Sequence, residues 1–210
     1  FTAVRSVKQG LLTQGCSVLN GFIRPEILAQ LESQGEAIAP NAYYTTETVN
    51  VFNTDITKSY PDGHPANLTF ERGNAFVARD RIPENYLISV LYTHPLFKQF
   101  LAACFDMDTL HELSDPLAGL CLNVLQKDKE HPWHFDTNEY TVSLLTKSAE
   151  QGGTFQYCPN IRSPEHENLT DVNAVITKQA SERVQHLDLQ VGDLQLFMGR
   201  YSLHRVSPVK

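Results

Sequence analysis

The sequence predicts an α+β fold that is mainly β, a jelly roll with N-terminal helices packed on it. After residue 115, seven short runs of alternating or β-branched residues follow one another, and turn residues separate them. Before residue 115, the apolar residues recur at helical spacing instead. A length of 210 residues fits one domain, so we expect a single domain over 1–210, with a helical and loop cap region (1–114) and a jelly-roll core (115–210).

The N-terminal region is expected to consist of helices and loops. A proline at a first-turn position and apolar residues three and four apart predict a helix over 25–37. Residues 39–67 are polar and aromatic with several turn residues, which predicts a long irregular segment that could cover a site. Two helices are expected within 83–105, with a break near 93–95. The apolar helical face from 87 to 101 is expected to be core or the surface of a homodimer.

The C-terminal region is expected to form the strands of the jelly roll. The pairs Gly152-Gly153 and Gly192-Asp193 are turn-forming and stand between predicted strands. Residues 159–172 are polar and contain two prolines, which predicts a surface loop. The expected strands are 119–126, 139–146, 154–157, 173–177, 184–189, 193–197 and 202–206.

Composition excludes several classes of protein. Seventeen basic and 24 acidic residues give a net charge of -7, so nucleic acid is not an expected partner. The apolar runs fall well short of the roughly 20 residues that span a bilayer, so no membrane segment is expected. Four cysteines without a C-x-x-C pair favour a reduced, cytoplasmic setting. The chain begins with Phe1 and not with Met, so it could be trimmed at either end.

The segment His-Phe-Asp at 134–136 gives the clearest indication of a functional site. Residues two apart in a strand point to the same side, so His134 and Asp136 can converge on one ion while Phe135 packs on the opposite side. A third donor, His204, stands in a later predicted strand. Two imidazoles and one carboxylate suit non-haem Fe(II), because they occupy one face of an octahedron and leave three positions open. A catalytic zinc site with the same donors is the alternative, whereas no cysteine flanks the motif to favour structural zinc.

Segments 134–136, 192–197 and 204–209 resemble the Fe(II)/2-oxoglutarate-dependent oxygenases with a double-stranded β-helix core. Segments 131–139 and 152–159 are similar to the branch that contains the BesD-like radical halogenases of free amino acids and their hydroxylating relatives. The resemblance implies Fe(II), 2-oxoglutarate and O2 as cofactor and cosubstrates. The two histidines and the aspartate are then both the metal ligands and the catalytic groups.

One residue distinguishes hydroxylation from halogenation within this branch. The halogenases have a small residue, commonly Gly, in place of the ligand carboxylate, and Asp136 fills that position here. The resemblance therefore implies hydroxylation of a C–H bond of a small polar substrate, expected to be a free amino acid such as lysine. One alternative is a hydroxylase of peptide or protein side chains with the same three ligands. Another is a jelly-roll module that binds a metal or ligand without catalysis.

The resemblance also implies residues that bind 2-oxoglutarate. Its distal carboxylate requires an Arg or Lys shortly after the distal histidine, so the anchor lies beyond Lys210, is Lys210 itself, or is another cation. Arg205 adjoins His204 and is expected to point to the other face of its strand. Asn123, a polar residue in an apolar run, is expected either to bind the cosubstrate or substrate, or to be a satisfied buried amide.

Four further residues are expected near the substrate by analogy with the amino-acid branch. His131 would face the substrate, and Arg72 would hold a carboxylate through bidentate hydrogen bonds, with a solvated surface role as the alternative for Arg72. Thr137 and Asn138 would supply polar contacts, or would be ordinary turn residues.

Overall fold

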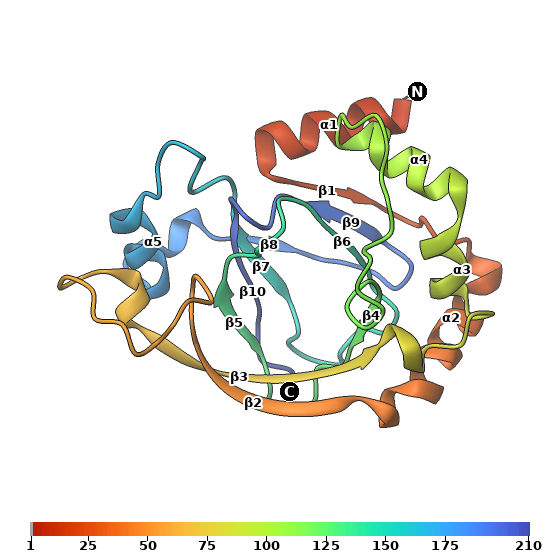
Figure 1. Cartoon of the computed structure of the whole chain (residues 1–210), viewed down its shortest axis with the longest axis horizontal. Coiled ribbons are helices and arrows are strands. Elements are labelled where there is room, and N and C mark those ends of the chain that lie inside the picture. Colours follow the sequence, from red (N-terminus) through yellow and green to blue (C-terminus); the bar gives the residue numbers. More distant parts are fainter. Residues whose placement is uncertain (1) are drawn as a thin grey trace.

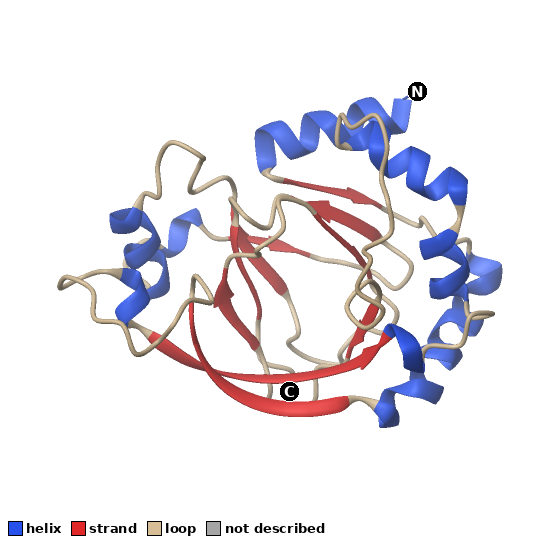
Figure 2. Cartoon of the chain, in the orientation of Figure 1, coloured by secondary structure: helices blue, strands red, loops and turns tan. Residues whose placement is uncertain are grey.

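The computed structural model describes residues 2–210, apart from the side chain of Asn74. The α-helices are α1 (Thr2–Gln14), α2 (Pro25–Ile38), α3 (Leu87–Thr93), α4 (Pro95–Cys104) and α5 (Leu169–Ile176). The strands are β1 (Cys16–Leu19), β2 (Tyr43–Asn50), β3 (Thr69–Ala78), β4 (Cys121–Asn123), β5 (His131–His134), β6 (Thr141–Leu144), β7 (Phe155–Cys158), β8 (Gln185–Leu187), β9 (Leu194–Phe197) and β10 (Leu203–Val206). The strands run through the centre, with α5 on one side and the other α-helices on the opposite side, while β2 and β3 form an edge that no α-helix in the described part of the chain covers (Figures 1 and 2). No helix within 2–210 is both long and apolar enough to cross a bilayer.

The strands form three antiparallel sheets, with the orders β1-β9-β6, β5-β10-β7-β8 and β2-β3-β4. The first two sheets share an apolar core, to which β1 contributes Cys16, β7 contributes Phe155 and Tyr157, and β9 contributes Phe197. Two antiparallel sheets packed face to face in this way form a jelly roll. The predicted fold class is therefore confirmed.

Helices cover the outer faces of these sheets. Val7 and Leu11 of α1 and Leu101 of α4 pack on Leu194 and Leu196 of β9. A separate layer, formed by α5, covers the four-stranded sheet on the side opposite α1 and α4 (Figure 1). These layers exclude water from both faces of the jelly roll, which is the main source of its stability.

The two predicted helical regions are confirmed. Pro25 stands at the first turn of α2, where a missing N–H costs nothing because that donor has no intrahelical partner. The break within 83–105 falls at His94, whose Nδ1 accepts a 3.2 Å hydrogen bond from the N–H of Leu96 and caps α4. Proline follows at the first position of α4, so α3 cannot continue through it.

The N-terminal region contains more β structure than the expectation of largely helix and loop allowed. Residues 39–67 contain β2, which pairs with β3 over eight residues. Most side chains of β2 are exposed, so the sequence shows no apolar alternation, and the backbone ladder holds the strand. The cap region also supplies β1, which pairs with β9 of the core, and α1, which the sequence did not predict.

The predicted strand at 173–177 is also wrong, and so is the C-terminal part of the predicted loop at 159–172. Both fall in α5, where Val172, Val175 and Ile176 lie on one buried helical face. β-branched residues are common in strands, so their composition favours a strand. Their spacing of three and four residues instead places them on one face of a helix, and packing of that face against the sheet stabilises the helix. The six other expected strands overlap β4, β6, β7, β8, β9 and β10.

Candidate metal centre

The two histidines of the predicted site lie directly opposite each other on neighbouring strands. His134 on β5 pairs in register with His204 on β10, and their ring centroids are 4.2 Å apart. Asp136 lies two residues beyond the end of β5, so its expected place inside the strand is wrong. Its N–H donates a 3.0 Å hydrogen bond to the carbonyl oxygen of Gly199, which holds it beside the strand pair.

The donor atoms of the three residues converge. Oδ1 of Asp136 lies 3.6 Å from Nε2 of His134 and 3.5 Å from Nε2 of His204. One donor atom from each residue lies within 4.8 Å of the other two. Ligands about 2.1 Å from a metal and at right angles to each other are about 3 Å apart, so an ion fits here with a small inward movement.

Both imidazoles have the tautomer that metal binding requires. Nδ1 of His134 lies 2.7 Å from the carbonyl oxygen of Pro132, and Nδ1 of His204 lies 2.9 Å from that of Ser202. A carbonyl oxygen only accepts hydrogen bonds, so each Nδ1 carries the proton. Each Nε2 then keeps its lone pair and faces the site.

The charges of the three groups also suit a divalent cation. Burial alone would raise the pKa of Asp136, but its contacts with His134 and His204 and the hydrogen bond from Thr141 outweigh burial and hold that pKa well below its usual range. His204 is buried against the rings of Phe155 and Phe197, and burial, together with the neighbouring His134, lowers its pKa. An anionic carboxylate and a neutral imidazole are the forms that bind a metal.

Two residues outside the predicted set fix the orientation of the Asp136 carboxylate. Thr141, the first residue of β6, donates a 2.6 Å hydrogen bond from Oγ1 to Oδ2. Gly199 leaves the space for this carboxylate, because a Cβ at that position would come within 2.0 Å of Oδ2. Neither residue belongs to a sequence pattern that signals a metal site, so sequence reasoning missed both.

A β-bulge brings His131 to the same side as His134. Residues three apart in a regular strand point to opposite faces, but the β5–β10 register shifts between the pairs His134–His204 and His131–Val206. The ring centroids of His131 and His134 are 6.4 Å apart as a result. Burial, followed by the neighbouring His134 and Arg72, lowers the pKa of His131 to about 4, so His131 is neutral near pH 7.

Arg72 lies on β3, close enough for its charge to act on His131. Its Nη2 forms a 2.6 Å ion pair with Oε2 of Glu47, and its Nη1 donates a 3.2 Å hydrogen bond to Oδ1 of Asn53. Nε of Arg72 is buried without a hydrogen-bond partner among the described residues. The guanidinium is thus held on one edge, and it has a donor left for a ligand.

The remaining predicted residues lie at the surface. Asn123 is exposed at the end of β4, so the expected buried amide is wrong. Thr137 and Asn138 are exposed in the bend after Asp136, and Lys210 is exposed as well. The sequence-based prediction for Arg205 is confirmed, because its guanidinium lies 4.8 Å over the ring of Trp133, on the face of the sheet opposite His204.

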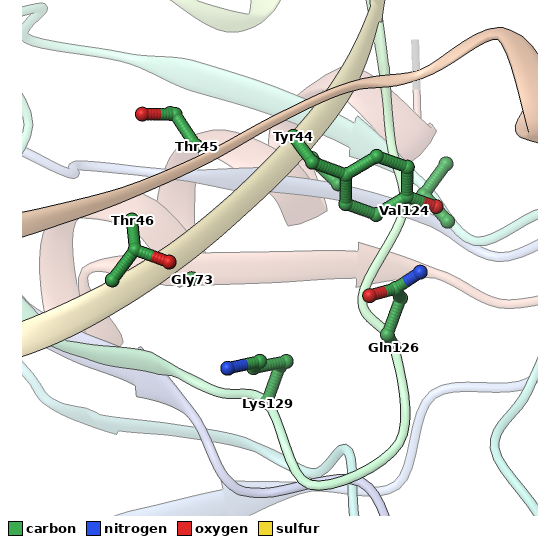
Figure 3. Close-up of a pocket in the computed structure, with 8 residues that line it drawn as sticks. Tyr44, Thr45, Thr46, Gly73, Val124, Gln126 and Lys129 are labelled. Carbon is green, nitrogen blue, oxygen red and sulfur yellow. The ribbon is translucent and has the colours of Figure 1, made fainter.

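A groove of about 280 Å3 lies between the β2–β3 hairpin and the segment that leads into β5 (Figure 3). Lys129 borders it, and its side chain lies over Gly73, where a Cβ would come 2.9 Å from Cδ of the lysine. None of the eight lining residues is one of the three candidate ligands.

Several solved structures share this fold. The chain matches a prolyl-4-hydroxylase from Pseudomonas putida over 98% of its own length and 92% of the other, with a TM-score of 0.56 and 14% identity. It matches a 2OG-Fe(II) oxygenase family protein from Burkholderia pseudomallei over 99% and 84%, with a TM-score of 0.60 and 15% identity. AviO1 from Streptomyces viridochromogenes matches over 97% and 87%, with a TM-score of 0.60 and 15% identity. No curated protein matches in sequence.

The jelly roll and its two-histidine, one-carboxylate site define a 2-oxoglutarate- and Fe(II)-dependent oxygenase. Fe(II), 2-oxoglutarate and O2 are the cofactor and cosubstrates of this class, and the three donors described above fit the metal. Residues 2–210 match the family model of halogenase D, and the chain belongs to that family.

Proposed function

We propose that this chain hydroxylates a C–H bond of a free amino acid, and that residues 1–210 act as one oxygenase domain. The observation that carries the choice of hydroxylation is the placement of the Asp136 carboxylate. Its Oδ1 lies within 3.6 Å of both Nε2 atoms, and Thr141 holds its other oxygen. The position that a halide would need is therefore filled by a protein ligand. Placement of the chain in the BesD-like branch is part of the same proposal.

The bound metal, 2-oxoglutarate and O2 supply the oxidising chemistry, in which a C–H bond becomes C–OH while 2-oxoglutarate becomes succinate and CO2. The chain contributes the geometry. His134, Asp136 and His204 would hold the metal, and the neutral His131 lies beside them, with its ring centroid 6.4 Å from that of His134. Rings of Phe155 and Phe197 shield His204 from water.

Arg72 supports an amino acid as the substrate. Its guanidinium can bind a carboxylate with the free Nε and a neighbouring N–H group, as bidentate recognition requires. The carboxylate of Glu47 is paired with the same guanidinium, which places an acceptor for an ammonium group nearby. A molecule with adjacent carboxylate and ammonium groups matches this pair of charges.

The other predicted contacts remain part of this proposal. Thr137 and Asn138 follow the ligand Asp136 and are exposed to an approaching substrate. Asn123 is assigned to 2-oxoglutarate or to the substrate.

A peptide substrate is the second candidate. The observation in its favour is the likeness in fold to two prolyl hydroxylases, one of which was solved in complex with a peptide fragment. A likeness in fold at 13% to 14% identity does not indicate the substrate. The ion pair between Glu47 on β2 and Arg72 on β3 therefore favours a free amino acid over a peptide.

The first test uses the purified chain without oxygen. Fe(II) and 2-oxoglutarate together should produce a visible charge-transfer band, and Asp136→Ala should lose the band and the turnover. The twenty amino acids and a set of peptides are then screened for succinate release, and products are identified by mass. One added oxygen on a free amino acid supports the proposal, replacement of hydrogen by chlorine refutes hydroxylation, and turnover of peptides alone selects the second candidate.

A further inference from the structure

One side-chain amide connects Arg72 to the segment that carries the metal ligands. Asn53 follows β2 and has a φ of +53°, in the left-handed region that Asn tolerates better than most residues. Its Nδ2 donates a 3.1 Å hydrogen bond to the carbonyl oxygen of Phe135. Its Oδ1 accepts a 3.2 Å hydrogen bond from Nη1 of Arg72. Asn53 therefore contacts both Arg72 and the residue between the ligands His134 and Asp136.

The Phe135 end of this connection is firmly held. The N–H of Phe135 donates a 2.8 Å hydrogen bond to the carbonyl oxygen of Val51, on the chain just before Asn53. The Phe135 ring stacks on Phe52 at 5.7 Å, and the guanidinium of Arg162 lies 3.9 Å over it. Residues on both sides thus fix the segment 134–136, and Asn53 takes its position from that segment.

The Arg72 end depends on Asn53. Its other polar partner is Glu47, whose side chain is 46% exposed, and an ion pair with so exposed a partner restrains a long side chain only weakly. The hydrogen bond to Asn53 is therefore the contact that fixes the position of Arg72 relative to the metal ligands.

We propose that Asn53 is a positioning residue that sets the distance between Arg72 and the metal, and so determines which substrate carbon faces the oxidising site. The inference rests on the proposed function, because it requires Arg72 to hold the substrate carboxylate. A displaced substrate still triggers consumption of 2-oxoglutarate, but fewer turnovers reach the target C–H bond. Loss of this contact therefore separates succinate formation from product formation and leaves metal binding intact.

The test compares two asparagines in the same segment. Asn53→Asp keeps an oxygen for Arg72 but loses the donor, and its carboxylate repels the carbonyl oxygen of Phe135. Asn67→Asp is the matched control, because Nδ2 of Asn67 also donates to backbone carbonyls, those of Tyr60 and Pro61. Both residues are exposed, so neither substitution opens a cavity in the core.

Three quantities are measured for each protein: the Fe(II)–2-oxoglutarate band without oxygen, the shift of that band on adding substrate, and the ratio of product to succinate. Asn53→Asp should keep the band within about twofold, lose the substrate-induced shift, and lower the product-to-succinate ratio at least about fivefold. A change in the carbon that is hydroxylated supports the proposal further. Asn67→Asp should match the wild type in all three.

Two results would overturn the proposal. The first is an Asn53→Asp variant whose product-to-succinate ratio and substrate-induced band shift equal those of Asn67→Asp. The second is loss of the band itself in Asn53→Asp, which would show that Asn53 supports the ligands and not the substrate. A wild-type chain that binds Fe(II) and 2-oxoglutarate, yet releases no substrate-dependent succinate, would instead refute the proposed function and this inference with it.

Discussion

Thr141 donates its hydroxyl hydrogen to Oδ2 of Asp136 over 2.6 Å, while Oδ1 of the same carboxylate faces the two imidazoles. The two oxygens thus have different tasks, since one is held by β6 and the other is left for the metal. Outer partners of this kind orient a ligand and lower the cost of organising it when the metal binds.

Thr141→Val should therefore weaken Fe(II) binding by about tenfold to a hundredfold, because the isosteric side chain cannot donate to Oδ2. Thr141→Ser keeps the hydroxyl and is expected to retain affinity within a few-fold of the wild type. The affinity is measured by anaerobic titration of Fe(II) against the charge-transfer band. Equal affinities for the Val and Ser variants would show that the hydrogen bond does not orient the ligand.

Gly199→Ala should remove metal binding more completely. The added Cβ would come within 2.0 Å of Oδ2, 2.6 Å of Cγ and 2.8 Å of Cβ of Asp136, so the whole side chain of Asp136 must move from its place beside the histidines. Gly35→Ala is the control, since a Cβ there meets nothing closer than 3.6 Å and alanine favours the α2 helix. We expect Gly199→Ala to unfold at a temperature near that of the wild type but to give no band. Retention of full metal affinity would mean that the backbone at 199 moves freely.

Asp136→Gly tests the reason for expecting hydroxylation. The substitution removes the carboxylate and leaves one more position at the metal for an outside ligand. Hydroxylation should fall by at least about a hundredfold, and azide or chloride should change the Fe(II)–2-oxoglutarate band in the variant but not in the wild type. Asp136→Glu keeps the charge and is the control for anion binding. An unchanged response to azide would show that the third position does not depend on Asp136.

The three candidate metal ligands, which the structure brings together, could be singled out from the sequence because each carries its own signal. His134 and Asp136 stand two apart next to an aromatic residue, and His204 lies in a recognisable strand segment. Most strands after residue 115 were predictable for the same reason, since their apolar residues alternate or are β-branched. Local pattern and final structure agree for these strands but not for α5, whose buried β-branched residues lie on a helix.

The supporting residues could not be predicted, because tertiary pairing alone gives them their roles. The bulge that turns His131 toward His134 exists only in the register between β5 and β10. Thr141 and Asn53 reach the ligand segment from β6 and from the end of β2, strands that are far from it in sequence. The strand β2 was missed for a related reason, because its stability comes from the ladder with β3 and not from its side chains.

The cysteines give a prediction that does not depend on the metal. Burial raises the pKa of Cys16, Cys104 and Cys158 to about 11, and burial followed by the charge of Asp115 raises the pKa of Cys121. The thiolate is the reactive form, so the three buried thiols should resist alkylation at pH 8. Cys121 is the only one of the four that is not buried, and it should react first. Cys121→Ser should remove the fast phase, while unfolded protein should react at every remaining cysteine.

The same three shifts make the fold sensitive to alkali. A thiol whose pKa is higher in the folded chain than in the unfolded one stabilises the fold fully below the unfolded pKa of about 9. That contribution is lost as the pH rises from about 9 toward 11, because the unfolded chain releases protons that the folded chain retains. The urea midpoint should therefore fall between pH 8 and pH 10.5, and it should fall less in a Cys16→Ala variant. An identical slope in the two proteins would show that the Cys16 thiol ionises as readily in the folded chain as in the unfolded one.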